Sequence, residues 1–483
     1  MLTLQANRST CDCECVSRRE LLRVGSLGLG AITLPALLQA SSQGSSAASF
    51  VRGKSVVFLY LRGGPTQYET WDPKMNAPSG IRAMYGETKT SLPGVTFGKH
   101  FLQMAAMADQ LAVVRSFRVG SGGHGPGRQL ITSGGNPAKA AMGALYAGLA
   151  GSNHPLSGLP TNAVVTPRAA GPQYESLRNE TDEILAVGEL AAECAAFDLG
   201  AGAGASKAGK KPRGGLIHDM RLNLASDRFD DRRALLQQIS ALRRQADRPG
   251  ALAGYDRFQQ QAFDVLLGGA TDAFDLSKED PRVVAEYDTG RFAAPASLRK
   301  KKSNNAKTIP SLSPIALGKQ LLLARRLCEA GCGFVTVTSS GWDMHGNAFG
   351  IDDGMACLGP AVDHAVAAFL RDLARRGLSE QILLVITGEM GRTPKINAKA
   401  GRDHWANLCP LVLAGGGLKM GQVIGASDKT GGSPNTEPYG VDHLLATIMH
   451  TLFDVSQLRL ARGLPTNLVR TIERSQPIKE LVA

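Results

Sequence analysis

Carboxylate and imidazole side chains gather in three short segments of this 483-residue chain. Two of the segments lie just behind apolar runs and the third comes a few residues after the second. Together they contain Asp343, His345, Glu389, Asp403 and His404. Oxygen and nitrogen donors in this mixture suit a divalent cation such as zinc, manganese or iron. The segments therefore predict a metal site with these five residues as candidate ligands.

Each segment also has a structural interpretation. Glu389 and Arg392 can pair as a loop clasp, and Asp403 can cap a turn that holds His404. Asp343 and His345 can likewise form hydrogen bonds with the loop backbone. One segment alone would not decide between the two interpretations. Three such segments behind predicted strands favour a shared site.

Six apolar segments have the length and composition of buried strands. Lys54–Leu61 (KSVVFLYL) is nearly continuous in apolar residues, which is typical of a strand covered on both faces. The other predicted strands are Leu111–Arg115, Ala163–Thr166, Gly333–Thr338, Gln381–Thr387 and Pro410–Ala414. Helical patterns between several of them occupy Ala138–Ala150, Ile315–Ala330, Gly354–Arg376 and Val441–Leu452. This alternation predicts an α/β fold with a mostly parallel sheet flanked by helices, and ligands in such sheets bind beyond the carboxyl ends of the strands.

The middle of the chain has a different character. Residues 199–211 are rich in glycine, alanine and lysine, 215–270 have apolar residues at helical spacing, and 290–312 are loop-like. We interpret 195–312 as a helical and loop insertion into a single α/β domain that spans residues 49–483.

The N-terminal residues have the pattern of an export signal. An arginine pair in Ser17-Arg18-Arg19-Glu20-Leu21-Leu22 precedes a short apolar run, Val24–Leu38, and small polar residues follow. The run is too short for a membrane span, which needs about 20 residues, and paired arginines indicate the twin-arginine export machinery. The alternative is an internal helix with an Arg-Arg start. We expect residues 1–48 to be removed and the mature protein, with no stable membrane span, to be periplasmic or extracellular.

The composition is that of a globular protein, and its charge does not indicate nucleic-acid binding. The hydrophobic content is 43% and the net charge is +12. Much of the excess positive charge lies in two loop-like runs, Lys207–Arg213 and Arg299–Lys302, without an aromatic platform or a known nucleic-acid motif. We therefore expect no nucleic-acid partner.

Motifs along most of the chain resemble a known family, the one catalogued as domain of unknown function 1501. They include SRRELLRVGSLGLG, FLYLRGGPTQYETWDPK, AFDLSKED, LLLARRLCEAGCGFVTV, GWDMHGN, GEMGRTPKIN, GRDHW and GQVIGASDKTG. The resemblance implies an exported protein of the alkaline phosphatase and sulfatase superfamily, with metals at the strand ends. It places Glu389, Asp403 and His404 as ligands with Asp343 and His345 as further candidates, and it implies that Arg392 and Lys395 meet an anionic substrate.

The chain departs from the superfamily pattern at the nucleophile. The segment His124-Gly125-Pro126-Gly127-Arg128 resembles the C-x-P-x-R motif of sulfatases, with His124 where the nucleophile stands and Arg128 as a substrate-binding candidate. The acidic residue that normally follows the first strand is replaced by Gly63-Gly64. Three roles are open to His124: a nucleophile, a metal ligand or a general base. We favour the last two.

Two functions fit these observations. The first is an exported hydrolase of phosphate or sulfate esters that depends on a divalent ion (zinc, manganese, iron or calcium), with His124 and Arg392 as catalytic candidates. The second is an inactive binding or scaffold protein of an exported system that processes polysaccharides or sulfated glycans. The carboxylate and histidine segments favour the hydrolase, and the missing nucleophile favours the binding protein.

Overall fold

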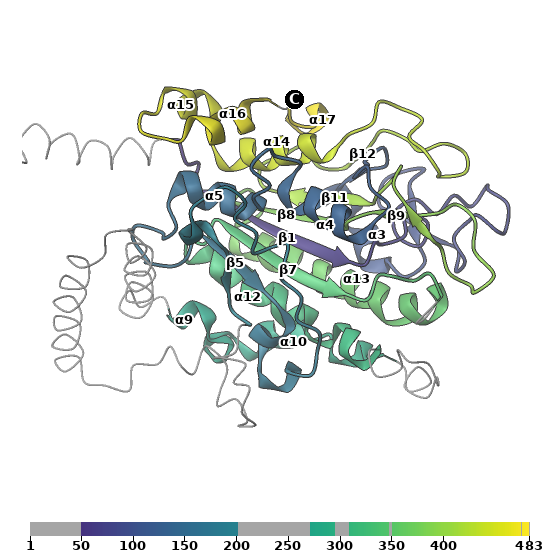
Figure 1. Ribbon diagram of the computed structural model, residues 1–483. Coiled ribbons are helices and arrows are strands. Elements are labelled where there is room, and N and C mark those ends of the chain that lie inside the picture. Colours follow the sequence, from purple (N-terminus) through teal and green to yellow (C-terminus); the bar gives the residue numbers. More distant parts are fainter. Residues whose placement is uncertain (1–49, 201–270, 295–308, 347–349, 475, 483) are drawn as a thin grey trace, which may run out of the picture.

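The computed structural model describes residues 50–200, 271–294, 309–346, 350–474 and 476–482, and Figure 1 shows their arrangement. The predicted export signal and most of the predicted insertion at 195–312 lie outside the described residues. The division of the chain into signal, domain and insertion therefore stays a prediction.

A sheet of eight strands in the order β12-β4-β11-β8-β1-β7-β5-β6 forms the centre of the molecule. In that order the strands are Gln422–Ile424, Ala112–Val114, Leu411–Gly415, Ile382–Thr387, Ser55–Arg62, Phe334–Ser340, Asn162–Val165 and Phe197–Asp198. All six predicted strands are present, with bounds shifted by one or two residues. Two short strands at the edges, β6 and β12, were not predicted.

Most neighbouring strands run parallel. β1 pairs in parallel with both β7 and β8, and β5 pairs in parallel with both β7 and β6. β11 is antiparallel to its neighbours β8 and β4, while β12 is parallel to β4. The predicted α/β class, a mostly parallel sheet flanked by helices, is confirmed.

Helices cover both faces of the sheet (Figure 1). Alternate residues of β1 point to opposite sides, as strand geometry requires. Val57 and Leu59 belong to the core cluster under α12 (Leu317–Glu329) and α13 (Ile351–Arg376). Val56 and Phe58 belong to the cluster under α5 (Met142–Ala150) and α14 (Val441–Leu452). Since β1 is buried on both faces, its apolar run is continuous.

The other helices in the described residues are shorter than α12, α13 and α14. They are α3 (Leu102–Ala106), α4 (His124–Ser133), α9 (Thr271–Phe274), α10 (Pro281–Glu286), α15 (Val455–Leu460), α16 (Thr466–Arg474) and α17 (Lys479–Val482). Single 3-10 turns occupy Ala108–Gln110, Pro167–Ala170, Pro172–Tyr174, Ala192–Cys194, Leu276–Lys278, Gly290–Phe292, Ile309–Leu312 and Pro314–Ala316.

Two small ribbons complete the fold. β2 (Glu87–Lys89) pairs with β3 (Thr96–Gly98), and β9 (Gly391–Arg392) pairs with β10 (His404–Trp405). In the β9–β10 ribbon Arg392 is opposite His404, so the second and third polar segments are joined by backbone pairing. Within the described residues no helix is both long and apolar enough to cross a membrane.

Candidate metal site

The polar segments meet because their strands end at one edge of the sheet. β1, β7 and β8 are mutually parallel, so their carboxyl ends lie side by side. Asp343 follows β7 by three residues and Glu389 follows β8 by two. His124 opens α4, which comes after β4 in the same half of the sheet. The site therefore lies where ligands bind in open α/β sheets.

Asp343 lies at the centre of the site. Its Oδ1 accepts a hydrogen bond from Arg392 Nη2 at 2.7 Å and lies 3.1 Å from His404 Nε2. Its Oδ2 lies 3.0 Å from His345 Nε2 and 3.3 Å from His124 Nε2. One carboxylate thus contacts three imidazole rings and one guanidinium, which keeps it ionised and fixed in place.

Three of these residues form a potential ligand set. The donor atoms of His124, Asp343 and His404 all lie within 4.8 Å of one another. Donors around a tetrahedral zinc ion, each about 2.1 Å from the metal, are about 3.4 Å apart. Small side-chain rotations therefore suffice to bring the three atoms around one ion. Two nitrogens and one carboxylate oxygen are a donor set that suits zinc, manganese or iron.

Both nitrogens of His404 face hydrogen-bond acceptors. Nδ1 lies 3.1 Å from the carbonyl oxygen of Gly122, and Nε2 lies 3.1 Å from Asp343 Oδ1. A neutral imidazole has only one N–H. When Nδ1 donates to the carbonyl, the Nε2 lone pair faces the carboxylate, and either a second proton or a cation must lie between them.

His124 has the same arrangement with two carboxylates. Its Nδ1 lies 2.9 Å from Glu389 Oε1 and its Nε2 lies 3.3 Å from Asp343 Oδ2. Hydrogen bonds with Asp343 and then Glu389 outweigh the effect of burial and raise the pKa of His124 to about 9. Histidine ligands of metals commonly donate the second ring N–H to a carboxylate or a carbonyl. Both His124 and His404 meet that condition through Nδ1, so the residues present fit a divalent ion.

Glu389 is fully buried behind His124. Its two oxygens accept hydrogen bonds from the backbone N–H of Gly63, both at 3.0 Å, and Oε2 accepts one from the Tyr60 hydroxyl at 3.1 Å. Burial acts to raise the pKa of Glu389, but the hydrogen bonds from His124 and the Gly63 N–H lower it below its usual value. The arrangement gives an ionised carboxylate that orients the His124 ring.

Burial and the neighbouring side chains also have opposite effects on the pKa of Asp343. Burial raises the pKa of this carboxyl, while the hydrogen bonds with His124 and His404 and the charge of Arg392 lower it far more. The net effect is a pKa well below the usual range, so Asp343 is available as an anionic ligand at neutral pH.

Arg392 lies beneath the site instead of at its open face. Its side chain is 1% exposed. Its guanidinium donates to the carbonyl oxygens of Gly63, Gly64, Trp342 and Arg402 as well as to Asp343. The sequence predicted a substrate contact for Arg392, but a group with this set of buried acceptors is placed to hold Asp343 and the surrounding loops.

Of the other predicted site residues, His345 lies in the site, whereas Asp403 and Lys395 lie outside it. His345 joins the cluster through its hydrogen bond with Asp343. Asp403 is exposed and accepts a hydrogen bond from Asn397 at 3.0 Å, and Lys395 is also exposed. Within the described residues, neither Asp403 nor Lys395 forms a hydrogen bond or ion pair with the three potential ligands.

Sequence reasoning did not find several groups that support the site. They are the Tyr60 hydroxyl, the Gly63 N–H and the Gly122 carbonyl oxygen. Two of the three are backbone groups, and nearly every residue type has these, so the sequence does not indicate which of them support a site. Tyr60 was detectable as the only polar side chain in the second half of the apolar run Ser55–Leu61, since a buried tyrosine hydroxyl requires a partner.

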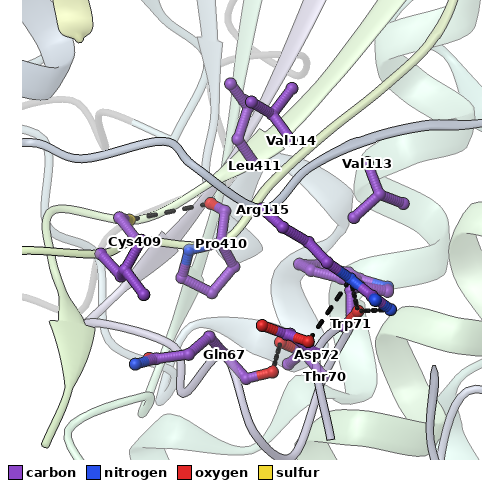
Figure 2. A pocket seen from close by; sticks show the side chains of 11 residues that line it. Gln67, Thr70, Trp71, Asp72, Val113, Val114, Arg115, Cys409, Pro410 and Leu411 are labelled. Atoms are coloured by element: carbon purple, nitrogen blue, oxygen red, sulfur yellow. Dashed lines mark hydrogen bonds and ion pairs between the residues drawn. The ribbon is translucent and has the colours of Figure 1, made fainter. Parts of the chain in front are cut away.

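A cavity is lined by residues of the loop that follows β1, of β4 and of the segment that leads into β11 (Figure 2). Arg115 lines it, donating to the Trp71 carbonyl oxygen at 2.7 and 3.0 Å and lying 3.5 Å from Asp72. The cavity measures about 20 Å³, roughly the space of one water molecule. It contains none of the potential metal ligands and is too small for a substrate.

The family to which the chain belongs is shown by its sequence. The profile of the family described as "Protein of unknown function (DUF1501)" matches residues 53–482. The chain is a member of that family. No curated protein matches it.

Solved structures similar to this one include three enzymes. A sulfatase from Pseudoalteromonas sp., PsFucS1, shares 13% sequence identity over 85% of this chain and 71% of its own, with a TM-score of 0.35. The phosphonate monoester hydrolase SpPMH from Silicibacter pomeroyi shares 10% over 88% and 76%, with a TM-score of 0.35. The lipoteichoic acid synthase LtaP from Listeria monocytogenes shares 9% over 86% and 78%, with a TM-score of 0.33.

Proposed function

We propose that this protein is a metal-dependent hydrolase of phosphate or sulfate esters that acts outside the cytoplasm. The observation that carries the proposal is the convergence of His124, Asp343 and His404, whose donor atoms lie within 4.8 Å of one another at the carboxyl edge of the sheet. The twin-arginine pattern before residue 48 supports a periplasmic or extracellular location.

In this proposal the ion is held by Nε2 of His124, Nε2 of His404 and a carboxylate oxygen of Asp343. A divalent ion bound there supplies a Lewis acid that polarises an ester oxygen and lowers the pKa of water. Zinc, manganese and iron suit these donors better than calcium, which prefers oxygen ligands.

The remaining side chains hold these three in place. Glu389 orients His124 through Nδ1, the Gly122 carbonyl oxygen orients His404, and Arg392 holds Asp343. We assign Glu389 and Arg392 to positioning, because their side chains are 0% and 1% exposed and so cannot touch substrate.

His345 is the candidate for proton transfer. Its Nε2 donates to Asp343 Oδ2, which assigns the lone pair of the neutral ring to Nδ1. Within the described residues no hydrogen bond involves that Nδ1. An imidazole in this state beside the ligands can accept a proton from water or return one to a leaving group.

A specific observation favours the alternative, a binding or scaffold protein that lacks turnover. Within the described residues no serine, threonine or cysteine side chain forms a hydrogen bond with His124, Asp343 or His404. A covalent intermediate on a hydroxyl or thiol therefore has no evident candidate. The hydrolase proposal requires direct attack by water, whereas the alternative requires only ligand binding.

Metal analysis tests the proposal first. We would measure zinc, manganese, iron and calcium by elemental analysis in the exported wild-type protein and in His404→Ala. His443→Ala serves as the matched control, because His443 is a part-exposed histidine on α14 whose side chain contacts Gly440, Asp442 and the ring of Tyr439 and none of the potential metal ligands. We expect about one ion per chain in the wild type and the control, and a loss of at least tenfold in His404→Ala.

Hydrolysis of phosphate and sulfate monoesters by the same three proteins decides between the two functions. Turnover that depends on the ion and is lost in His404→Ala supports the hydrolase. Equal metal content in all three proteins contradicts the site. A stoichiometric ion without hydrolysis of either ester class contradicts the hydrolase and favours the binding protein.

A further inference from the structure

Two arginines beside the candidate metal site are occupied by carboxylates from a loop. Arg62 is the last residue of β1, and its Nε lies 2.9 Å from Glu180 Oε2 while its Nη1 lies 3.1 Å from Glu183 Oε2. Arg128 is on α4, and its Nη1 lies 3.4 Å from Glu183 Oε1. Glu183 thus bridges the two guanidinium groups.

These arginines adjoin the proposed ligands. Arg128 is one helical turn after His124, and its Nε lies 3.7 Å from Glu389 Oε1. Arg62 immediately precedes Gly63, whose N–H donates to the same Glu389. An anion bound between Arg62 and Arg128 would therefore lie next to the cluster of His124 and Asp343.

The arginines lie on a strand and a helix, whereas their partners lie on a loop, where Glu180 also contacts Arg178 at 3.3 Å and Ser340 at 3.4 Å. Arg62 lies in the central strand with a side chain 6% exposed, and Arg128 lies in a helix. Glu180 and Glu183 lie in a segment without helix or strand, and their side chains are 26% and 22% exposed. Rotation of the two glutamates toward water is enough to vacate the arginines.

The glutamates can move while the backbone stays anchored. Before them, the N–H of Arg178 donates to the Ser311 carbonyl oxygen at 2.8 Å. After them, Ile184 is buried at 4% exposure. The segment between these anchors carries both carboxylates.

The hydrogen bonding of the arginines is incomplete. Nε of Arg62 and Nε of Arg128 are both buried, and neither has a hydrogen-bond partner, although Glu180 and Glu389 lie near them as ionic neighbours. A buried charged donor without a hydrogen bond costs free energy. A tetrahedral oxyanion offers more acceptor directions than a planar carboxylate and binds guanidinium groups through paired N–H groups.

We propose that Arg62 and Arg128 form an anion-binding subsite for a sulfate or phosphate group, which Glu183 and Glu180 occupy until the ligand displaces them. The subsite takes a second anionic group of the substrate and so selects polyanionic molecules over simple monoesters. Anion binding at Arg62 and Arg128 needs neither a metal ion nor turnover and so is independent of the hydrolase function, whereas the selection of substrates rests on that proposed function.

The competing explanation is that the ion pairs only hold the loop in place. The two explanations predict different effects when glutamine replaces Glu180 and Glu183. If the glutamates compete with an anion, their neutralisation tightens anion binding. If they only hold the loop, neutralisation lowers stability and leaves anion binding unchanged.

The test uses metal-free protein and inorganic sulfate as the probe, so that sulfate bound to an ion does not contribute. Isothermal titration calorimetry would compare the wild type with Glu183→Gln and with Glu180→Gln/Glu183→Gln. We expect sulfate affinity to rise at least tenfold in the double variant and to fall to background when Arg62→Gln is added. Thermal unfolding in increasing sulfate, followed on the same proteins, should show a larger rise of Tm in the double variant than in the wild type.

Glu473→Gln is the matched control, because it neutralises a remote surface ion pair with Arg459 at 2.9 Å. It should bind sulfate as the wild type does. Unchanged affinity in both Glu183→Gln and the double variant would overturn the proposal. So would an equal gain in Glu473→Gln, which would indicate a general effect of net charge. Glu183→Gln alone keeps Glu180 and provides the comparison if the double variant does not fold.

Discussion

At the residue scale, the two histidines among the potential ligands have both ring nitrogens in contact with other groups. His124 lies between Glu389 and Asp343, and His404 lies between the Gly122 carbonyl oxygen and Asp343. In each ring Nδ1 contacts a supporting group and Nε2 points to the shared carboxylate. The group that contacts Nδ1 therefore orients the ring, which is the arrangement that a histidine metal ligand needs.

Replacement of Tyr60 by phenylalanine tests the support behind His124. The Tyr60 hydroxyl is fully buried and donates to Glu389 Oε2 at 3.1 Å, and burial raises its pKa, so it stays protonated. Its loss leaves a buried carboxylate with one donor fewer. We expect Tyr60→Phe to lower the free energy of unfolding by about 2 kcal/mol and to weaken metal binding severalfold, measured by denaturant unfolding and metal titration.

Tyr287→Phe is the control for this prediction. The Tyr287 hydroxyl is also buried and donates to a buried carboxylate, Asp372 Oδ2, at 3.0 Å. Its loss should cost a similar free energy without any change in metal affinity. Equal weakening of metal binding in both variants would show that the effect of Tyr60→Phe is general destabilisation.

At the scale of elements, the turn after β1 packs closely against the loop that follows β7. Gly63 has φ +123°, and a Cβ built there would lie 2.5 Å from the backbone N of Asp343 and 2.9 Å from that of Trp342. The position that carries an acidic residue in the resembled superfamily therefore has no room for a side chain here.

Gly63→Ala should disrupt the turn severely. The substitution places a Cβ against backbone atoms and forces a non-glycine residue to a strained positive φ. We expect a loss of about 3 kcal/mol or more in the free energy of unfolding, together with loss of the bound ion. Gly53→Ala is the matched control, because φ is +67° there and no atom lies within 4 Å of the built Cβ; it should cost about 1 kcal/mol. A Gly63→Ala protein as stable as Gly53→Ala would contradict the packing argument.

At the scale of the whole molecule, the sheet was predictable from the sequence and the shape of the site was not. The buried strands give apolar runs such as Ser55–Leu61 because both faces of the sheet are covered. Parallel strands then bring their carboxyl ends together, which predicted that Asp343 and Glu389 lie at one edge of the sheet, where His124 contacts both. Side-chain depth is set by packing between distant segments, so the sequence did not show that Glu389 and Arg392 lie beneath the site.

Short edge strands were also beyond sequence reasoning. β6 contains Phe197 and Asp198, and β12 contains Gln422 to Ile424. Two or three residues are too few to show a period, and their extended conformation depends on pairing with β5 and β4. The ribbon that sets Arg392 opposite His404 was not predicted for the same reason.

Long-range ion pairing holds the segment around Glu279 to the helices below the sheet, and it should make stability depend on pH. Glu279 lies within 2.9 Å of Arg326 and of Arg376, pairs also with Arg325, and is 6% exposed. Burial acts to raise its pKa, but hydrogen bonds with Arg325 and Arg326 lower it from 4.5 to about 2.

Because the folded pKa of Glu279 is below the unfolded value, the ion pairs stabilise the protein fully above pH 4.5, and this contribution is lost as the pH falls through about 2. Glu279→Gln should therefore unfold about 2 kcal/mol more easily than the wild type at pH 7, after allowance for solvent screening. The difference should shrink to about half at pH 3, where much of the wild-type contribution is gone. Urea unfolding at both pH values measures it, with the exposed pair variant Glu473→Gln expected to stay within about 0.5 kcal/mol of the wild type throughout. A difference for Glu279→Gln that is the same at pH 7 and pH 3 would mean that its charge contributes nothing, and that packing alone joins this segment to the sheet domain.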